Sequence, residues 1–459
     1  MMPERQSKPV AILVTGLALF AMYFGAGNLI FPAMIGMTAG ENVTPVIIGF
    51  LLTGVALPVL GMIAASTQRR GEHDGIASRI GTYPSLVFTI AIFLSTGMLY
   101  AIPRVATVSF EMAAAPILAG GAGGETTQAD LFIYTVIFFA AVGIIALNPG
   151  RLVDRLGTYL TPALLIVLAI LIVTALVTMD PVSVPPAEDY ASDPLPAGLL
   201  QGYYTMDAIA SLVFSGVILS ALARAGFTSR RRLIWRSTLA AGTAGIGLAI
   251  VYLGLAAVGT RVAGQGLTDG AAGLAYAASE ALGPVGQAVF SAVAILACLT
   301  TAIGLIGASS QYFRKLFPKL THPTLVLVQT FVALSLANLG LETILEIVTP
   351  VNQLLYPIAI CIIAIALLDV VTPGRLHWTY RLSAWTAAIV AIPEALWATQ
   401  IPVFEGLRDW LDLLPAGSVN MAWVVPALVA AAIGILLDLS QGRLRPVKGG
   451  DELPVLIYK

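Results

Sequence analysis

The sequence predicts an all-α membrane protein. Its 459 residues are 58% hydrophobic and only 11% charged, with a mean hydropathy of +0.89. Such a chain has too few polar residues to cover a water-facing surface, so its outer surface must face lipid. The apolar residues also fall into about a dozen stretches of roughly 20 residues, the length that spans a hydrocarbon core about 30 Å thick. We therefore expect a polytopic helical protein with the lipid bilayer as its surroundings.

Twelve transmembrane helices are expected from these stretches. They lie at about 9–35, 44–65, 84–112, 130–148, 157–179, 199–223, 237–260, 284–312, 322–340, 342–369, 378–399 and 420–438. The loops between them are short, so we treat 1–459 as a single transmembrane domain.

The positions of lysine and arginine support this count and give an orientation. In short loops, positive charges are retained on the cytoplasmic side. If the N-terminus lies inside, every Lys and Arg except Arg104, Arg261 and Arg408 falls in an inner segment. We therefore expect both termini in the cytoplasm. The net charge of −1 gives no reason to expect a nucleic-acid partner.

The sequence lacks the motifs of several protein classes. It has no G-x-x-x-x-G-K-[ST] stretch for phosphates and no H-E-x-x-H zinc motif. Cys298 and Cys361 lie in expected spans without a C-x-x-C partner, so neither disulfides nor a zinc site is expected. Because the loops are short, the function must lie within the membrane. This favours a secondary transporter rather than an enzyme; a channel, or an enzyme acting on lipids, is the alternative class.

The first span contains helix-breaking residues at mid-membrane. In FGAGNLIFP, Gly25, Gly27 and Asn28 are followed by Pro32. Backbone groups freed by a break within the bilayer need protein, water or ligand as partners, and transporters use such breaks as binding sites. The amides that begin the second half-helix suit a substrate carboxylate, and the free carbonyls of the first half suit a cation. The alternative is that the glycines only allow close helix packing.

An inverted repeat would place a second break five helices later. The sixth span carries Gln201, Tyr203, Tyr204, Thr205 and Asp207, where an ordinary span would be aliphatic. An aspartate at depth is costly and usually functional, because it pairs with a cation or titrates. The alternative places Asp207 near the outer interface as a helix cap.

Three further spans carry polar residues. In the eighth, Thr300 and Thr301 follow Ala297 by about one turn, and oxygen ligands of this kind suit Na⁺, although threonines also bond to carbonyls of their own helix. In the tenth, Asn352 and Tyr356 lie between two prolines, which indicates either a gate or a packing kink. In the third, Arg104 and Glu111 are seven residues apart, which favours an outer salt link or interfacial anchor over a substrate contact.

Several of these motifs together resemble one family. FGAGNLIFP, IPR followed by SFE, GYYTMDAIASLVF, CLTTAIGL and VNQLLYPIAI are similar to the bacterial branched-chain amino acid:cation symporters of the BrnQ or LIVCS type. The resemblance covers essentially all twelve helices. It implies the leucine-transporter-like fold, with inverted repeats at 9–179 and 199–369 and two further helices at 378–438. It also implies import of leucine, isoleucine and valine with Na⁺ across the bacterial cytoplasmic (inner) membrane.

The resemblance also assigns site residues. The substrate-binding positions are Gly25, Ala26, Gly27, Asn28, Thr205, Asp207 and Ser211. The matching Na⁺ ligands are Ala21, Phe24, Ala297, Thr300 and Thr301, the first three through carbonyls, with Asn352 and Tyr356 in gating or coupling.

This chain departs from the leucine transporters in its sixth helix. There is no glycine at the expected break, and Asp207 stands there instead. Asp207 is open to three roles: contact with the substrate ammonium, binding of a second cation, or carriage of a proton. A symporter of the same fold for another solute, or a sodium-gated channel or sensor that does not transport, is the alternative function. No organic cofactor is expected.

Overall fold

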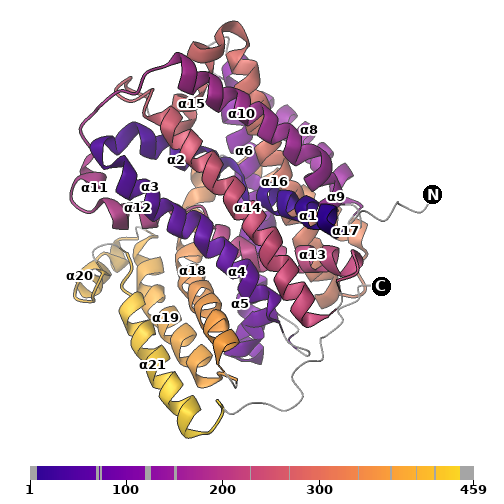
Figure 1. The fold of residues 1–459 in the computed structure, drawn as a ribbon, viewed down its shortest axis with the longest axis vertical. Coiled ribbons are helices and arrows are strands. Elements are labelled where there is room, and N and C mark those ends of the chain that lie inside the picture. Colours follow the sequence, from indigo (N-terminus) through magenta and orange to yellow (C-terminus); the bar gives the residue numbers. More distant parts are fainter. Residues whose placement is uncertain are drawn as a thin grey trace.

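A computed structural model describes residues 8–68, 72, 75–118, 126–148, 152–227, 229–267, 269–339, 341–372, 375–399, 401–417 and 420–444 of the chain. The described residues form a bundle of helices and contain no β-strand (Figure 1). Each predicted span coincides with one helix or with two or three consecutive helices.

The first five spans run from α1 to α10. Their helices are α1 (Lys8–Tyr23) with α2 (Ala26–Thr38), α3 (Val43–Leu51) with α4 (Leu57–Ser66), α5 (Thr82–Leu94) with α6 (Ala101–Ser109) and α7 (Ala115–Leu118), α8 (Gln128–Ala146), and α9 (Leu152–Arg155) with α10 (Thr161–Thr178). Wider π-helical turns join several of these pieces, as at Leu52–Ala56 and Ser95–Leu99.

The remaining seven spans run from α12 to α21. Their helices are α12 (Pro194–Tyr203) with α13 (Asp207–Arg224), α14 (Arg230–Gly259), α16 (Gly286–Leu316), α17 (His322–Ala337), α18 (Leu341–Val371), α19 (Trp378–Trp397) and α21 (Val424–Ser440). Three shorter helices lie in predicted loops: α11 (Glu188–Ala191), α15 (Gly270–Leu282) and α20 (Leu407–Asp412).

Most of these helices are long and apolar enough to cross a membrane. Within the described residues, 8 helices are long and apolar enough to cross a membrane, or up to 9 if the bent pair α1–α2 counts as one span. The helices α17 and α21 are apolar but shorter, and α19 is not among the 8. The chain is thus a multi-pass membrane protein, while the count of twelve and the boundaries of the two repeats stay predictions.

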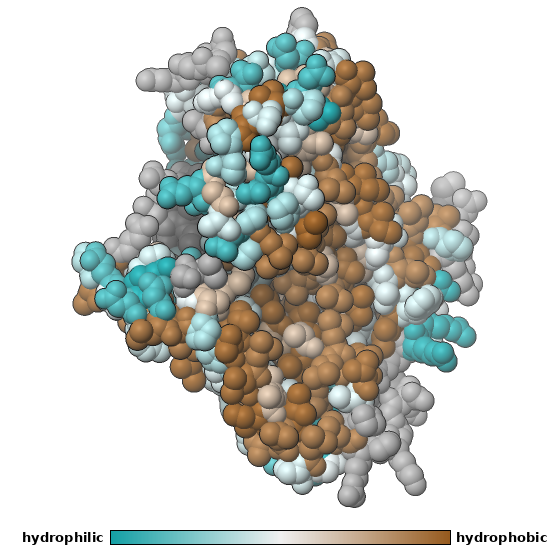
Figure 2. Space-filling model, turned by 60° about the vertical axis from the view of Figure 1, so that its left-hand side comes forward, coloured by the Kyte–Doolittle hydropathy of each residue, from teal (hydrophilic) through white to brown (hydrophobic). Residues whose placement is uncertain are grey.

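The surface agrees with a lipid environment. Figure 2 shows a broad hydrophobic surface, with hydrophilic residues gathered mainly toward its margins. Large apolar side chains are exposed on the outer helices, as with Val177, which is 80% exposed at the end of α10. In water this exposure would cost free energy, whereas in lipid it does not.

The centre of the bundle is α16. It is the most buried of the 8 apolar spans, with 72% of its apolar window inside the protein. It contacts α1, α13 and α6, so both interrupted helices of the predicted site pack against it.

Glycines bring α2 into backbone contact with α14. A Cβ on Gly36 would lie 2.0 Å from the carbonyl oxygen of Ala256, and one on Gly259 would lie 2.1 Å from that of Ala33. No side chain fits at these distances, so the two helices cross closer than any other residue type allows. This crossing fixes the second half of the first span against the seventh.

The last two spans form a separate pair. The helices α18, α19 and α21 lie side by side at one edge of the bundle (orange and yellow in Figure 1). The buried carboxylate of Asp438 in α21 accepts hydrogen bonds from the backbone N–H groups of His377, Trp378 and Thr379 at 2.9, 3.0 and 3.1 Å. These donors would otherwise be unpaired at the start of α19. Asp438 therefore caps the neighbouring helix and fixes the pair.

Removal of this cap should destabilise the protein. We expect Asp438→Ala to lower the free energy of unfolding by about 2–3 kcal/mol, because it deletes hydrogen bonds to a charged acceptor. Asp409→Ala, at an exposed position in α20 of the same region, is the control. Thermal unfolding of the purified protein in detergent gives the comparison. Equal melting temperatures for the two variants would contradict the capping role.

Candidate functional site

The first helix is broken where the sequence predicts it. The helix α1 ends at Tyr23, α2 begins at Ala26, and the two axes are bent by 68°. Gly25 between them has extended backbone angles, φ −109° and ψ −163°. Its N–H donates to the side-chain oxygen of Asn28 at 3.3 Å. The side chain of Asn28 thus satisfies one backbone group that the break frees.

The sixth span is broken as well, without a glycine. The helix α12 ends at Tyr203 and α13 begins at Asp207. Met206 between them is left-handed, with φ 63° and ψ 11°, a conformation that costs a non-glycine residue about 1–2 kcal/mol. Strained backbone of this kind is common at functional sites.

A buried polar group joins the two breaks. The amide nitrogen of Asn28 donates to the carboxylate of Asp207 at 2.6 Å, and also to the hydroxyl of Tyr252 in α14. Asn28 and Asp207 are each only 3% exposed. The two residues are far apart in sequence but meet in the protein interior. Asp207 is therefore buried between helices and does not lie at the membrane interface as a helix cap.

A cavity lies at the junction. The predicted substrate residues Gly25, Gly27, Asn28, Thr205 and Asp207 line it. The hydroxyl of Thr205 donates to the carbonyl of Gly202 at 2.8 Å, within its own half-helix. Two interrupted helices therefore present polar groups to one space.

The remaining predicted substrate residues do not contribute side chains to this cavity. Ser211 is buried, and its hydroxyl donates to the carbonyl of Ala208 at 2.6 Å. It packs toward Gly61 of α4, where an added Cβ would lie 2.1 Å from its oxygen. Ala26 supplies the first backbone position of α2, and its side chain lies outside the described residues.

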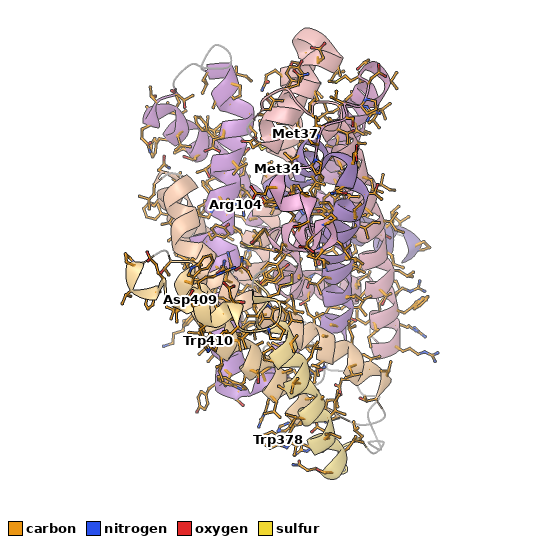
Figure 3. The ribbon with its side chains drawn as sticks, turned by 90° about the vertical axis from the view of Figure 1, so that its left-hand side faces the viewer. Met34, Met37, Arg104, Trp378, Asp409 and Trp410 are labelled. Carbon is orange, nitrogen blue, oxygen red and sulfur yellow. The ribbon has the colours of Figure 1, made fainter. Side chains whose placement is uncertain are left out.

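Residues of the third span also line the cavity, which the sequence analysis treated as a minority possibility. Thr96, Tyr100 and Arg104 face it from α6 and the turn before it. Arg104 lies in the middle of the molecule (Figure 3). The expected link with Glu111 is not found among the described ion pairs, and Glu111 is exposed.

Apolar side chains also line the cavity. They are those of Met22, Val105, Ala210, Phe214 and Leu305. A ligand with one polar end and one aliphatic end would find groups of both kinds in this lining.

The predicted ion ligands are divided by the structure into two groups. The hydroxyl of Thr301 donates to the carbonyl of Ala21 at 3.3 Å, which joins α16 to the end of α1. Thr301 also lies against Gly25, where a Cβ would be 3.1 Å from its oxygen. Thr300 instead donates to the carbonyl of Ala297 at 3.0 Å, one turn earlier in its own helix. Phe24 is fully buried and stacks on Phe20 and Tyr252.

The predicted gating residues lie beside the breaks but outside the cavity lining. The side-chain oxygen of Asn352 accepts a hydrogen bond from Ser95 at 2.7 Å, in the π-helical turn of the third span. The ring of Tyr356 packs on that of Tyr203 at the end of α12, with centroids 3.7 Å apart. The helix α18 thus contacts two interrupted helices.

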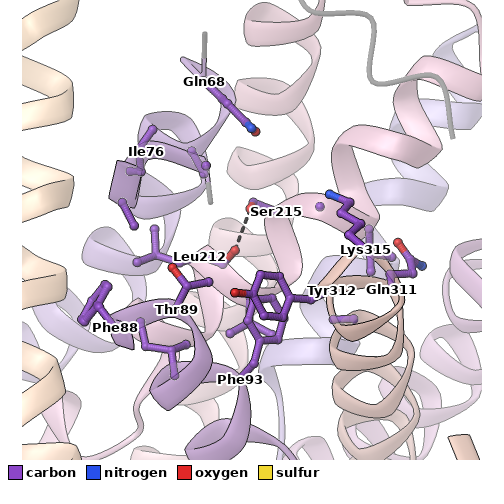
Figure 4. A pocket seen from close by; sticks show the side chains of 18 residues that line it. Gln68, Ile76, Phe88, Thr89, Phe93, Leu212, Ser215, Gln311, Tyr312 and Lys315 are labelled. Atoms are coloured by element: carbon purple, nitrogen blue, oxygen red, sulfur yellow. Dashed lines mark hydrogen bonds between the residues drawn. The ribbon is translucent and has the colours of Figure 1, made fainter. Parts of the chain in front are cut away.

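A second cavity follows the first along α13 and α16. Figure 4 shows its lining, with Thr89, Ser215 and Lys315 among the polar residues. Phe93 stacks on Tyr312 across it, with centroids 4.2 Å apart. The first cavity ends at Phe214 and Leu305, and the second begins within a turn of them. The two spaces are therefore neighbours, and the second opens among segments that the charge distribution predicts to be cytoplasmic.

Sequence reasoning missed Tyr252 and Tyr100 and undervalued Arg104. Arg104 had a signal, since an arginine within an apolar span is rare, whereas tyrosines are common in the spans of this chain. Nothing in the sequence showed, however, that the three converge on the same space.

The fold and the site together define a membrane transporter built around interrupted helices. The solved structure of Mhp1, a nucleobase-cation-symport-1 family transporter in a closed conformation with bromovinylhydantoin bound, aligns with a TM-score of 0.58. The alignment covers 95% of this chain and 93% of that chain, at 15% identity. At this identity the likeness shows the fold alone, which is the leucine-transporter-like fold that the sequence predicts.

The chain belongs to the family of branched-chain amino acid transport proteins, whose model matches residues 8–441. It is 39% identical to the branched-chain amino acid permease BrnQ of Corynebacterium glutamicum over 97% of this chain and 99% of that protein. The permease BraB of Bacillus subtilis is 36% identical over 95% of this chain and 98% of its own. The resemblance inferred from the motifs is confirmed, as is the expectation of a transporter rather than an enzyme.

The hydrogen bond between the two breaks should be measurable as a coupling energy. We expect the double-mutant cycle Asn28→Ala with Asp207→Ala to give about 1.5–3 kcal/mol, because each single variant leaves the partner buried and unsatisfied. Thermal or denaturant unfolding in detergent supplies the four stabilities. The control cycle, Asn28→Ala with Gln329→Ala, pairs Asn28 with a buried residue that bonds Ser310 elsewhere and should be additive. A coupling near zero in the first cycle would contradict the contact.

Proposed function

We propose that the chain is a secondary active symporter that imports leucine, isoleucine and valine with Na⁺ by alternating access. Its place would be the bacterial cytoplasmic membrane, with both termini in the cytoplasm. The observation that carries the proposal is the meeting of the two helix breaks, through Asn28 and Asp207, at a cavity lined by both polar and aliphatic side chains. The names of the relatives, which are branched-chain amino acid permeases, supply the substrate class.

The lining of the cavity favours broad branched-chain specificity. Its aliphatic side chains, such as those of Val105, Ala210 and Leu305, offer no polar group that would select among leucine, isoleucine and valine. One methylene changes binding in an apolar pocket by only about 1–3 kcal/mol. The polar side chains of the lining would hold the amino and carboxyl groups that all three share.

The contact between Thr301 and Ala21 is the most suitable place for Na⁺. It brings a hydroxyl and a carbonyl from two different spans to 3.3 Å, next to the break at Gly25. Oxygen ligands of this kind suit a hard cation. An ion held there would fix α1 against α16 and thereby order the neighbouring substrate cavity, so ion and substrate would favour the same state.

The neighbouring cavity supports a path to the cytoplasm. Movement of α13 against α16 near Phe214 and Leu305 would join the two spaces. The polar lining of the second space would then hydrate a substrate that leaves the central site.

Proton coupling is the second candidate, because Asp207 is a buried carboxyl group at the centre of the site. Uptake of radiolabelled leucine into proteoliposomes separates the two. An inward Na⁺ gradient drives accumulation if Na⁺ couples, and a proton gradient with choline in place of Na⁺ drives it if H⁺ couples. Leucine counterflow in the same vesicles distinguishes a carrier from a channel or a sensor, since only a carrier exchanges bound substrate across the membrane.

The ion site yields a matched pair of variants. We expect Thr301→Ala to raise the Na⁺ concentration for half-maximal leucine uptake at least about tenfold, because it removes the hydroxyl that faces α1. Thr300→Ala should change it little, since that hydroxyl bonds to its own helix. The measurement is the Na⁺ dependence of initial uptake rates in proteoliposomes. An unchanged Na⁺ dependence in Thr301→Ala would refute the ion site.

Asp207 can be tested by an isosteric change. We expect Asp207→Asn to reduce leucine uptake at least about tenfold, because the amide keeps the size of the side chain but can neither pair with an ammonium nor carry a proton. Asp180→Asn, in an exposed outer segment, is the control. Uptake is measured from about pH 5.5 to 8 in both variants. Normal transport by Asp207→Asn at every pH would remove Asp207 from the mechanism.

A further inference from the structure

The cavity is bordered by a third interrupted helix. Within the π-helical turn of the third span, Gly97 has non-helical backbone angles, φ −98° and ψ −130°. Tyr100 also departs from helical angles, with φ −141° and ψ −68°, and α6 begins immediately after it. Arg104 therefore lies in the first turn of a new helix, with Pro103 beside it, at the level of the other two breaks.

The guanidinium of Arg104 faces the break in the first helix. Its Nη2 atom would lie 3.7 Å from a Cβ on Gly27, and Gly27 has no side chain to separate the two. Its Nη1 atom donates to the hydroxyl of Tyr100 at 2.8 Å, and the group lies 5.5 Å from the centre of that ring. Because Gly27 has no side chain, Arg104 lies next to the backbone of the break, with the ring of Phe31 beside them.

Most of the donors on Arg104 have no acceptor in the described part of the chain. A guanidinium has five N–H donors, and the one hydrogen bond described for the guanidinium of Arg104 goes to the hydroxyl of Tyr100. No carboxylate among the described residues lies within ion-pair distance. A charged group within a membrane protein needs a partner, because its desolvation is otherwise uncompensated. We therefore expect the partner of the Arg104 guanidinium to be a ligand bound in the cavity.

The cavity carries one positive and one negative side chain, Arg104 and Asp207. An amino acid is a zwitterion with a carboxylate and an ammonium on the same carbon. Arginine binds carboxylates through two parallel N–H donors, and the amides at the start of α2 add positive potential on the same side. Asp207 would then face the ammonium.

We propose that Arg104 binds the α-carboxylate of the substrate and thereby makes the carboxylate a requirement for binding. This inference rests on the proposed amino-acid substrate but not on the identity of the coupling ion. It differs from the expectation from the sequence, in which the amides of the second half-helix suited the carboxylate and Arg104 was favoured as an outer salt link or interfacial anchor over a substrate contact.

The test compares leucine with two analogues that each lack one charge. Leucinamide lacks the carboxylate, and 4-methylpentanoate lacks the ammonium. Affinities are measured by calorimetry on the purified full-length protein, for the wild type and for Arg104→Gln and Asp207→Asn. Arg408→Gln, in α20 and outside the cavity, is the control. Arg104→Met is a second neutral variant, in case Arg104→Gln does not fold.

We expect the wild type to prefer leucine over leucinamide by at least about 100-fold, since a bidentate ion pair is lost with the amide. In a folded neutral variant of Arg104 this preference should fall to within about fivefold, while the preference for leucine over 4-methylpentanoate persists. In Asp207→Asn, the preference for leucine over 4-methylpentanoate should fall in the same way, while the preference for leucine over leucinamide persists. The control should keep both preferences.

Two results would overturn the assignment. One is a folded neutral variant of Arg104 that keeps the wild-type preference for leucine over leucinamide. The other is an equal loss of both preferences in that variant, which would indicate general damage to the cavity. A wild-type protein that binds no leucine would instead refute the proposed function, and this outcome is visible before any variant is made.

Discussion

The hydrogen bond from Asn28 to Asp207 is the contact on which the rest of the site depends. A break in a membrane helix frees backbone groups that lipid cannot satisfy, so the break must be closed by protein or by ligand. Here the side chain of Asn28 bonds to the backbone at Gly25, to Asp207 across the second break, and to Tyr252. One residue therefore joins three spans. Both breaks therefore share one buried hydrogen bond.

The surrounding bundle holds these breaks in place. Close contact of α2 with α14 at Gly36 and Gly259 sets the position from which Tyr252 reaches Asn28. Between the second and third spans, the guanidinium of Arg79 pairs with Glu72 at 2.8 Å and with Asp369 at 3.4 Å, which ties α18 to this connecting segment. The helices α19 and α21 pack beside α18 at the edge of the bundle.

The spans and the first two breaks were predictable because their signals are local. Apolar stretches long enough to cross lipid give the helices, and most of their ends lie within a few residues of the predicted ones. FGAGN and the polar residues before Asp207 differ clearly from the apolar residues on either side of them in the sequence. The helix α15 was not predicted, since the Ala- and Gly-rich segment 270–282 has neither the length nor the hydrophobicity of a span.

The sequence by itself determined that this chain is a membrane protein. It also determined which segments form helices and where two of these helices break. Only the tertiary structure decided which side chains share the cavity. Successive residues of an α-helix point about 100° apart, so a small rotation of a helix exchanges one face for another. Thr301 faces α1 while Thr300 bonds to its own helix, Ser211 points to α4, and Arg104 points inward rather than to an outer partner. The direction of each side chain follows from packing between segments that are distant in the sequence, and a local sequence pattern cannot predict it.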